Sequence, residues 1–140
     1  MAITYTNTYY DDIIENLATI INNEMSIPIY YDEHRGNHSF LITPESDNLV
    51  DYLSGGIHRE FNVNIEYKLK IGGQYNKNNF KQVSNIMERL KRLVYNNQSY
   101  NSGENWFEAK IENVEYERDE ENLSTLRAVA VFNCQNIEAI

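Results

Sequence analysis

The sequence predicts an α+β fold: an antiparallel sheet of about four to five strands with two helices packed on one face. Apolar residues occupy every second position from Phe61 to Ile71, which is the pattern of a strand with one buried face. Two further segments repeat apolar residues at three- and four-residue spacing, as amphipathic helices do. Because the 140 residues contain no repeat or linker, we expect residues 1–140 to form a single domain.

The first helix is expected from Asp11 to Asn23. Its apolar stripe consists of Tyr10, Ile13, Ile14, Leu17, Ile20 and Ile21. Thr8 is placed to cap the start, and Asp11 suits the positive end of the helix dipole. We expect the stripe to belong to the core.

Two short strands are expected next. The segment from Ile27 to Asp32 has strand character, and Pro28 favours an edge position because proline cannot donate to a ladder. Residues 33–38 are predicted to turn, and residues 39–43 to return as a second strand. We therefore expect the two strands to form a hairpin-like unit.

The segment from Pro44 to Gly56 is predicted as a loop or insertion, because it is rich in turn-forming residues. It carries four apolar residues: Leu49, Val50, Tyr52 and Leu53. Apolar side chains are unfavourable in water. We therefore expect this candidate docking loop either to fold onto its own domain or to contact a partner.

The remaining elements follow the long strand. A second helix is expected from about Lys77 to Tyr95. Residues 106–117 form a strand whose alternation changes parity near Glu112 and Asn113, which predicts a β-bulge. After an acidic turn, residues 125–136 are apolar on both faces, which predicts a central strand.

The chain is acidic, with 21 Asp and Glu against 12 Lys and Arg and a formal net charge of -9. This balance is unfavourable for gripping a phosphate backbone, because such binding relies on cations that displace counterions. An acidic surface suits a passage through which DNA moves without sticking.

The charges are also segregated along the chain. A basic stretch holds Lys68, Lys70, Lys77, Lys81, Arg89, Lys91 and Arg92. An acidic stretch follows, with Glu104, Glu108, Glu112, Glu115, Glu117, Asp119, Glu120 and Glu121. These stretches are either solvated surface or two complementary faces that meet between neighbouring copies.

No nucleophilic triad or phosphate-binding loop is recognised in the sequence. Cys134 is the only cysteine, and its apolar neighbours predict a buried thiol. His34 and His38 are four residues apart, but Gly36 between them indicates a solvated turn. We expect no metal or other cofactor.

One enzymatic alternative comes from Glu66 and Lys68 on the long strand. This acidic-x-Lys pair resembles the end of the PD-(D/E)xK nuclease motif, in which carboxylates hold Mg²⁺ and the lysine helps to orient water. No Pro-Asp pair precedes it, because Pro44 is followed by Glu45 and Asp51 stands alone. We expect no enzymatic activity and retain the Mg-dependent nuclease as the alternative.

The layout resembles the tail terminator (tail completion, minor tail) proteins of long-tailed bacteriophages over essentially the whole chain. The resemblance rests on the opening helix at 11–23, the strand at 27–30, the segment 56–61, the helical segment 87–90, Trp106, and the segment 114–116. It implies a structural virion protein of the tail or neck, assembled in the host cytoplasm. The family has no enzymatic activity.

The resemblance also implies partners. These are other copies in a ring, usually a hexamer, together with the tail tube protein and neck or connector proteins. DNA would pass through the ring without specific binding, and no membrane is involved. The basic residues Lys77, Lys81, Arg89 and Arg92 are candidates for one subunit face. The acidic residues Glu115, Glu117, Asp119, Glu120 and Glu121 are candidates for a hairpin at the ring surface or lumen.

Two non-enzymatic alternatives remain open. Another neck or head-completion protein would have similar features. A small adaptor that binds one different protein as a monomer is the other possibility. The 11 tyrosines are compatible with all three, because exposed tyrosine favours protein interfaces.

Overall fold

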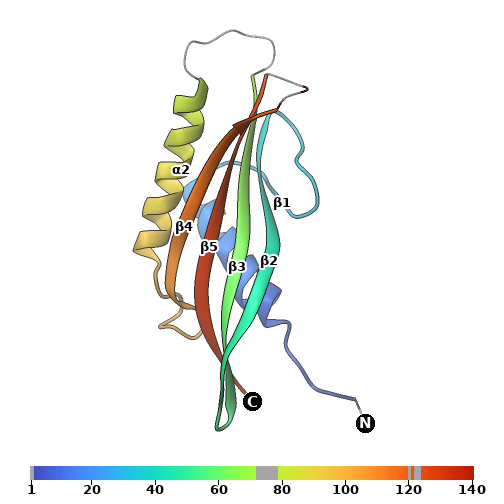
Figure 1. The fold of residues 1–140 in the computed structure, drawn as a ribbon, viewed down its shortest axis with the longest axis vertical. Helices are drawn as coiled ribbons and strands as arrows, with labels where there is room; N and C mark the ends of the chain where they lie inside the picture. Colours follow the sequence, from blue (N-terminus) through green and yellow to red (C-terminus); the bar gives the residue numbers. More distant parts are fainter. Residues whose placement is uncertain (1, 72–78, 120, 122–123) are drawn as a thin grey trace.

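The computed structural model describes residues 2–71, 79–119, 121 and 124–140. The described part is an α+β fold with a five-stranded sheet in the order β1-β2-β3-β5-β4. The strands are β1 (Ile29–Tyr30), β2 (His38–Leu53), β3 (Gly56–Lys70), β4 (Phe107–Arg118) and β5 (Thr125–Ala139). The helical elements are η1 (Tyr9–Ile14), α1 (Glu15–Glu24) and α2 (Asn79–Asn96). Figure 1 shows the long strands running along the longest axis of the molecule.

Alternation along β3 and β5 decides where the core lies. The odd-numbered residues of β3 from Phe61 to Leu69 are buried, as the sequence predicted. They pair with the even-numbered residues of β5 from Leu126 to Cys134, which are buried as well. The buried residues of α1 and α2 belong to the same core cluster. The core therefore forms between this sheet face and the helices.

The first helix is longer than predicted and begins differently. A π-helical segment, η1, leads directly into α1, which ends at Glu24. The expected cap at Thr8 is wrong, because its side chain makes no capping hydrogen bond. Thr8 Oγ1 instead donates to Glu138 Oε1 at 2.9 Å, which ties the helix start to the end of β5. The apolar stripe is buried as expected, except for Tyr10, which is half-buried.

The expected hairpin between the first two strands is also wrong, because β1 and β2 are parallel. Residues 31–37 carry the chain back along the sheet before β2 begins (Figure 1). Phe40 N donates to Pro28 O at 2.8 Å, which fixes the two strands side by side. β1 is an edge strand, as Pro28 indicated.

The largest correction concerns residues 44–56, which are not a loop. β2 continues to Leu53, and a two-residue turn with Gly55 at positive φ leads into β3 at Gly56. Register shifts between Pro44 and Ser46 and between Leu49 and Asp51 interrupt the pairing. These bulges disturb the strict alternation by which a strand is recognised in sequence. Pro44 is tolerated in β2 because it lies next to a bulge and on the outer side of the strand.

The second half of the chain agrees with the prediction. α2 carries the expected buried stripe and ends at Asn96; its predicted start at Lys77 lies outside the described residues. β4 has the expected register shift between Ile111 and Asn113, and a further one between Phe107 and Lys110. β5 is a central strand, between β3 and β4.

Candidate docking surfaces

The far end of the β2–β3 hairpin projects beyond the helices (Figure 1). Every β2 residue from Pro44 to Leu53 is exposed. The end of β5 runs alongside, because Ile57 pairs with Glu138 and Ile140 N donates to Gly55 O at 2.9 Å. Three strand segments therefore form one projecting finger.

The finger ends in an exposed group of apolar residues, which we call the apolar tip. Its members are Leu49, Val50, Tyr52, Leu53, Ile137 and Ile140. Tyr52 is 73% exposed and Ile140 is 80% exposed, so these side chains bury little of their apolar surface within the chain. A gathered group of exposed apolar side chains marks an interaction site more often than isolated ones do. All four residues of the predicted docking segment belong to the tip.

Hydrogen bonds of the Tyr9 hydroxyl connect the base of the finger to the helical layer. The Tyr9 hydroxyl accepts from Glu45 N at 3.0 Å and also contacts the carbonyl oxygens of Ser46 and Asn62. Burial raises the pKa of the Tyr9 phenol above its ordinary value, so the hydroxyl keeps its proton. Its ring lies edge-on to Phe61, with 5.0 Å between the ring centroids. The finger is therefore attached to η1 at its base. The part of the finger beyond these hydrogen bonds is not covered by the helices.

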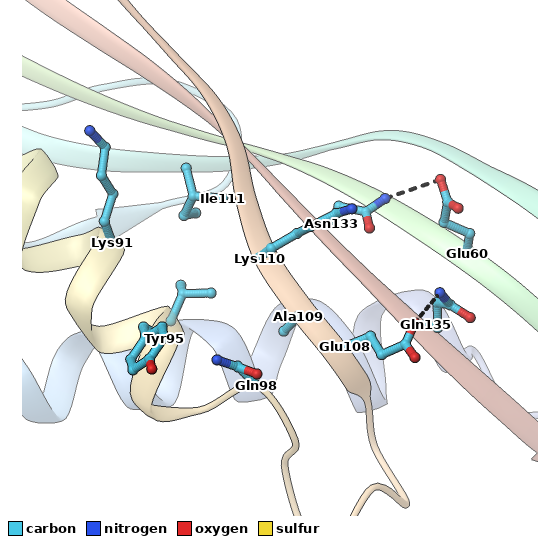
Figure 2. A pocket seen from close by; sticks show the side chains of 11 residues that line it. Glu60, Lys91, Tyr95, Gln98, Glu108, Ala109, Lys110, Ile111, Asn133 and Gln135 are labelled. Carbon is cyan, nitrogen blue, oxygen red and sulfur yellow. Dashed lines mark hydrogen bonds between the residues drawn. The ribbon is translucent and has the colours of Figure 1, made fainter.

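A groove runs between α2 and β4. One hollow of about 550 Å³ is lined by Phe80, Ser84, Glu88, Lys91 and Tyr116. A second hollow of about 500 Å³ shares Lys91 and continues past Tyr95 and Gln98 to the beginning of β4. Figure 2 shows the residues that line this second hollow on both sides of β4, with Lys91 and Tyr95 on one side and Asn133 and Gln135 on the other. We use the name α2 groove for the α2 residues that line these two hollows, together with Tyr116 of β4. The α2 residues are Phe80, Ser84, Glu88, Lys91, Val94 and Tyr95.

The predicted basic residues are exposed on α2, but they differ in their partners. Arg89 Nε lies 2.9 Å from Glu24 Oε1, and Arg89 Nη2 donates to Glu24 O at 2.7 Å, so Arg89 joins α2 to α1. The Arg92 guanidinium lies 5.8 Å from the centroid of the Tyr95 ring, at the edge of the α2 groove. Lys81 is exposed near the start of α2, and Lys77 lies outside the described residues.

The predicted acidic residues lie at the end of β4 and after it. Glu115 and Glu117 are exposed on β4, opposite Val129 and Arg127 of β5. Asp119 Oδ2 accepts from Arg127 Nη2 at 2.9 Å, so it contributes to an internal ion pair. Glu121 is exposed, and Glu120 lies outside the described residues.

The acidic-x-Lys pair lies on the sheet face opposite the core. Glu66 Oε2 is 3.5 Å from His34 Nε2, and Glu66 Oε1 is 3.8 Å from Arg127 Nη1. The His34 imidazole is the main reason why the pKa of Glu66 is lowered, with Arg127 adding to it. Asp51, the other carboxylate considered with this motif, pairs with His58 of β3, far along the strand from Glu66.

The cysteine and two of the histidines are held by burial or by contacts with neighbouring side chains. Cys134 is buried, and burial raises the pKa of its thiol, so the predicted buried thiol is confirmed. His34 Nδ1 lies 2.7 Å from Ser39 Oγ, and His38 Nδ1 lies 3.2 Å from Tyr67 Oη. Within the described ranges, no three His, Cys, Asp or Glu side chains are grouped so that they could hold a metal ion. None of the helices described has the length and hydropathy needed to cross a membrane.

No protein-family model matches the chain, and no curated protein is similar enough in sequence to count as a relative.

Sequence reasoning found four of the six tip residues and missed two features. Ile137 and Ile140 join the tip only because β5 extends to Ala139 beside the hairpin. The α2 groove was missed because its two walls, α2 and β4, are separate in sequence. The available signal was the high tyrosine content, which includes Tyr95 and Tyr116.

Proposed function

We propose that this chain is a structural subunit that assembles with other protein subunits through its apolar tip. The observation that carries the proposal is the finger itself. It extends β2, β3 and β5 beyond the region that the helices cover, and it ends in six exposed apolar side chains. A domain that only needed to fold would gain nothing from this extension, because exposed apolar area is unfavourable in water.

In its specific form, the proposal is a tail-terminator-like ring of a bacteriophage. Copies of the chain would form a ring, hexameric as in that family, on the end of the tail tube and join it to the neck. The support for this form is the resemblance described above, together with the net charge of -9. Exposed carboxylates such as Glu115 and Glu117 would keep DNA from adhering if they face the lumen, by repulsion at short range.

Removing the apolar tip tests the proposal. A variant with Leu49→Ser, Tyr52→Ser and Leu53→Ser should remain folded, because these side chains are exposed in the single chain. We expect the unchanged protein to form rings or to cap purified tail tubes in electron micrographs, and the variant to do neither.

The matched control is Ile3→Ser with Tyr5→Ser. These two residues are 85% and 82% exposed but lie outside the tip, in the segment before η1. The control should behave like the unchanged protein. Assembly of the tip variant at the unchanged level would overturn the proposal. Failure of the unchanged protein both to self-associate and to bind tubes would do the same.

A further inference from the structure

We propose that the apolar tip of one copy binds in the α2 groove of a second copy. This inference rests on the proposed function and names the partner of the tip. It joins two surfaces that lie on one chain and cannot meet within it, because Figure 1 shows the tip at one end of the molecule and α2 beside the other part of the sheet.

The first argument is charge complementarity. Residues 44–53 contain Glu45, Asp47 and Asp51 and no lysine or arginine, so this side of the finger carries three negative charges. Beside Tyr95, a further hollow on α2 is lined by Arg89, Lys91 and Arg92 against Glu88, which leaves a net charge of +2 there. Two surfaces of opposite charge attract, whereas two tips facing each other would place six carboxylates together.

The second argument is the chemistry of the groove. Phe80 and Tyr116 line its apolar part, and Tyr95 stands exposed at its other end. Aromatic side chains in a depression are typical anchors for an inserted apolar group. Arg92 lies beside the Tyr95 ring, and Lys91, which pairs with Glu88 at 3.0 Å, lines the same hollow.

The third argument is the symmetry of the contact. The tip and the α2 groove are different surfaces, so their pairing is heterologous, and each copy would still have a free tip or a free groove. Such a contact continues from copy to copy and forms a ring where its rotation closes, or an open filament where it does not. A ring with one kind of interface is therefore compatible with this pairing.

Disulfide trapping tests the pairing directly. Tyr52→Cys places a thiol on the tip, and Tyr95→Cys places one beside the α2 groove. The natural Cys134 is buried and takes no part. When the two variants are mixed at high protein concentration under mild oxidation, we expect a covalent dimer that contains one copy of each. Tyr52→Cys mixed with Asn22→Cys, an exposed position on α1, is the matched control and should give none.

Charge exchange supplies an independent measurement. Asp51→Lys or Arg92→Glu alone should weaken self-association about tenfold in sedimentation equilibrium. The two changes combined in one chain should restore most of the loss, because the opposite charges face each other again. Arg35→Glu, which alters an exposed pair with Glu33 on the loop after β1, should have no effect.

The outcomes separate this inference from the proposed function. A dimer formed by Tyr52→Cys alone would show that tips meet each other, which overturns the inference. Self-association that depends on the tip but gives no mixed dimer and no charge rescue also overturns it, while the proposed function stands. If removing the tip leaves self-association unchanged, both fail.

Discussion

The two halves of the β2–β3 hairpin are both paired strand to strand, but their surroundings are opposite. In the half nearest β1, which we call the root, Phe40 and Ile42 of β2 pair with Tyr67 and Ile65 of β3, and all four are fully buried. In the finger, Leu49 and Tyr52 are also paired with β3, although two register shifts interrupt the ladder there, and both are exposed.

The difference between the root and the finger lies in what covers them. Residues of η1, α1 and α2 share the core with the root, whereas the finger meets the helical layer at its base, where Tyr9 of η1 bonds Glu45 and Ser46. Burial in a sheet is therefore decided by the layer placed on it and not by the strand alone. Apolar residues that the helices leave uncovered are available for another protein chain.

The largest effect expected from this contrast is on stability. Phe40→Ala should lower the free energy of unfolding by about 3–5 kcal/mol, because it opens a cavity in a fully buried site. Tyr52→Ala on the same strand should change it by less than about 0.5 kcal/mol. Urea denaturation followed by circular dichroism measures both. Equal losses would contradict the division into a buried root and an exposed finger.

A smaller effect is expected at the point where the finger meets the end of β5. A Cβ added to Gly56 would lie 2.8 Å from the backbone oxygen of Glu138, too close for β3 and β5 to keep their spacing. Gly56→Ala should therefore cost about 1–3 kcal/mol. It should also speed amide hydrogen exchange at Ile140, whose N–H donates to Gly55 O.

The control for this prediction is Ser54→Ala in the adjacent turn, which adds no atom near β5. It should leave the exchange at Ile140 unchanged. Slow exchange at Ile140 in Gly56→Ala would mean that the end of β5 does not depend on this close approach.

The smallest effect concerns pH and belongs to the root, where Glu66 lies opposite Leu41. The pKa of Glu66 is lower in the folded chain than its ordinary value of 4.5. A carboxylate with a depressed pKa stabilises the fold above its unfolded pKa, and this contribution is lost as the pH falls through the folded pKa. Glu66→Gln should therefore cost about 1 kcal/mol at pH 7 and reduce the loss of stability on acidification below pH 4.5.

A double-mutant cycle with His34→Asn identifies the cause. The two changes should be less than additive at pH 7, because each removes the same interaction between the imidazole and the carboxylate. Additive losses would indicate that Glu66 acts through Arg127 or through solvent instead.

Periodicity was sufficient to predict the regular elements. The alternation from Phe61 to Leu69, the stripe of α2 and the parity switch near Asn113 each reflect the side-chain period within a single element. Such patterns are local, so they can be recognised without knowing where the rest of the chain lies. The buried Cys134 followed from the same alternation in β5.

The candidate docking surfaces were only partly predictable. The sequence indicated that Leu49, Val50, Tyr52 and Leu53 needed a covering surface, but bulges concealed that they lie on a strand. The direction of β1 was missed because a short connection such as residues 31–37 usually joins antiparallel strands, whereas these two strands are parallel. The α2 groove required the packing of α2 beside β4, which no local pattern encodes.

By itself, the sequence determined the fold class, the core faces of β3 and the helices, the central place of β5, and the acidic and basic stretches of the chain. Only the tertiary structure decided that β2 and β3 continue past the helical layer and that the end of β5 joins them there. The physical reason is that side-chain periodicity reports which face of an element avoids water. How far that face is covered depends on the lengths and positions of elements distant in the chain.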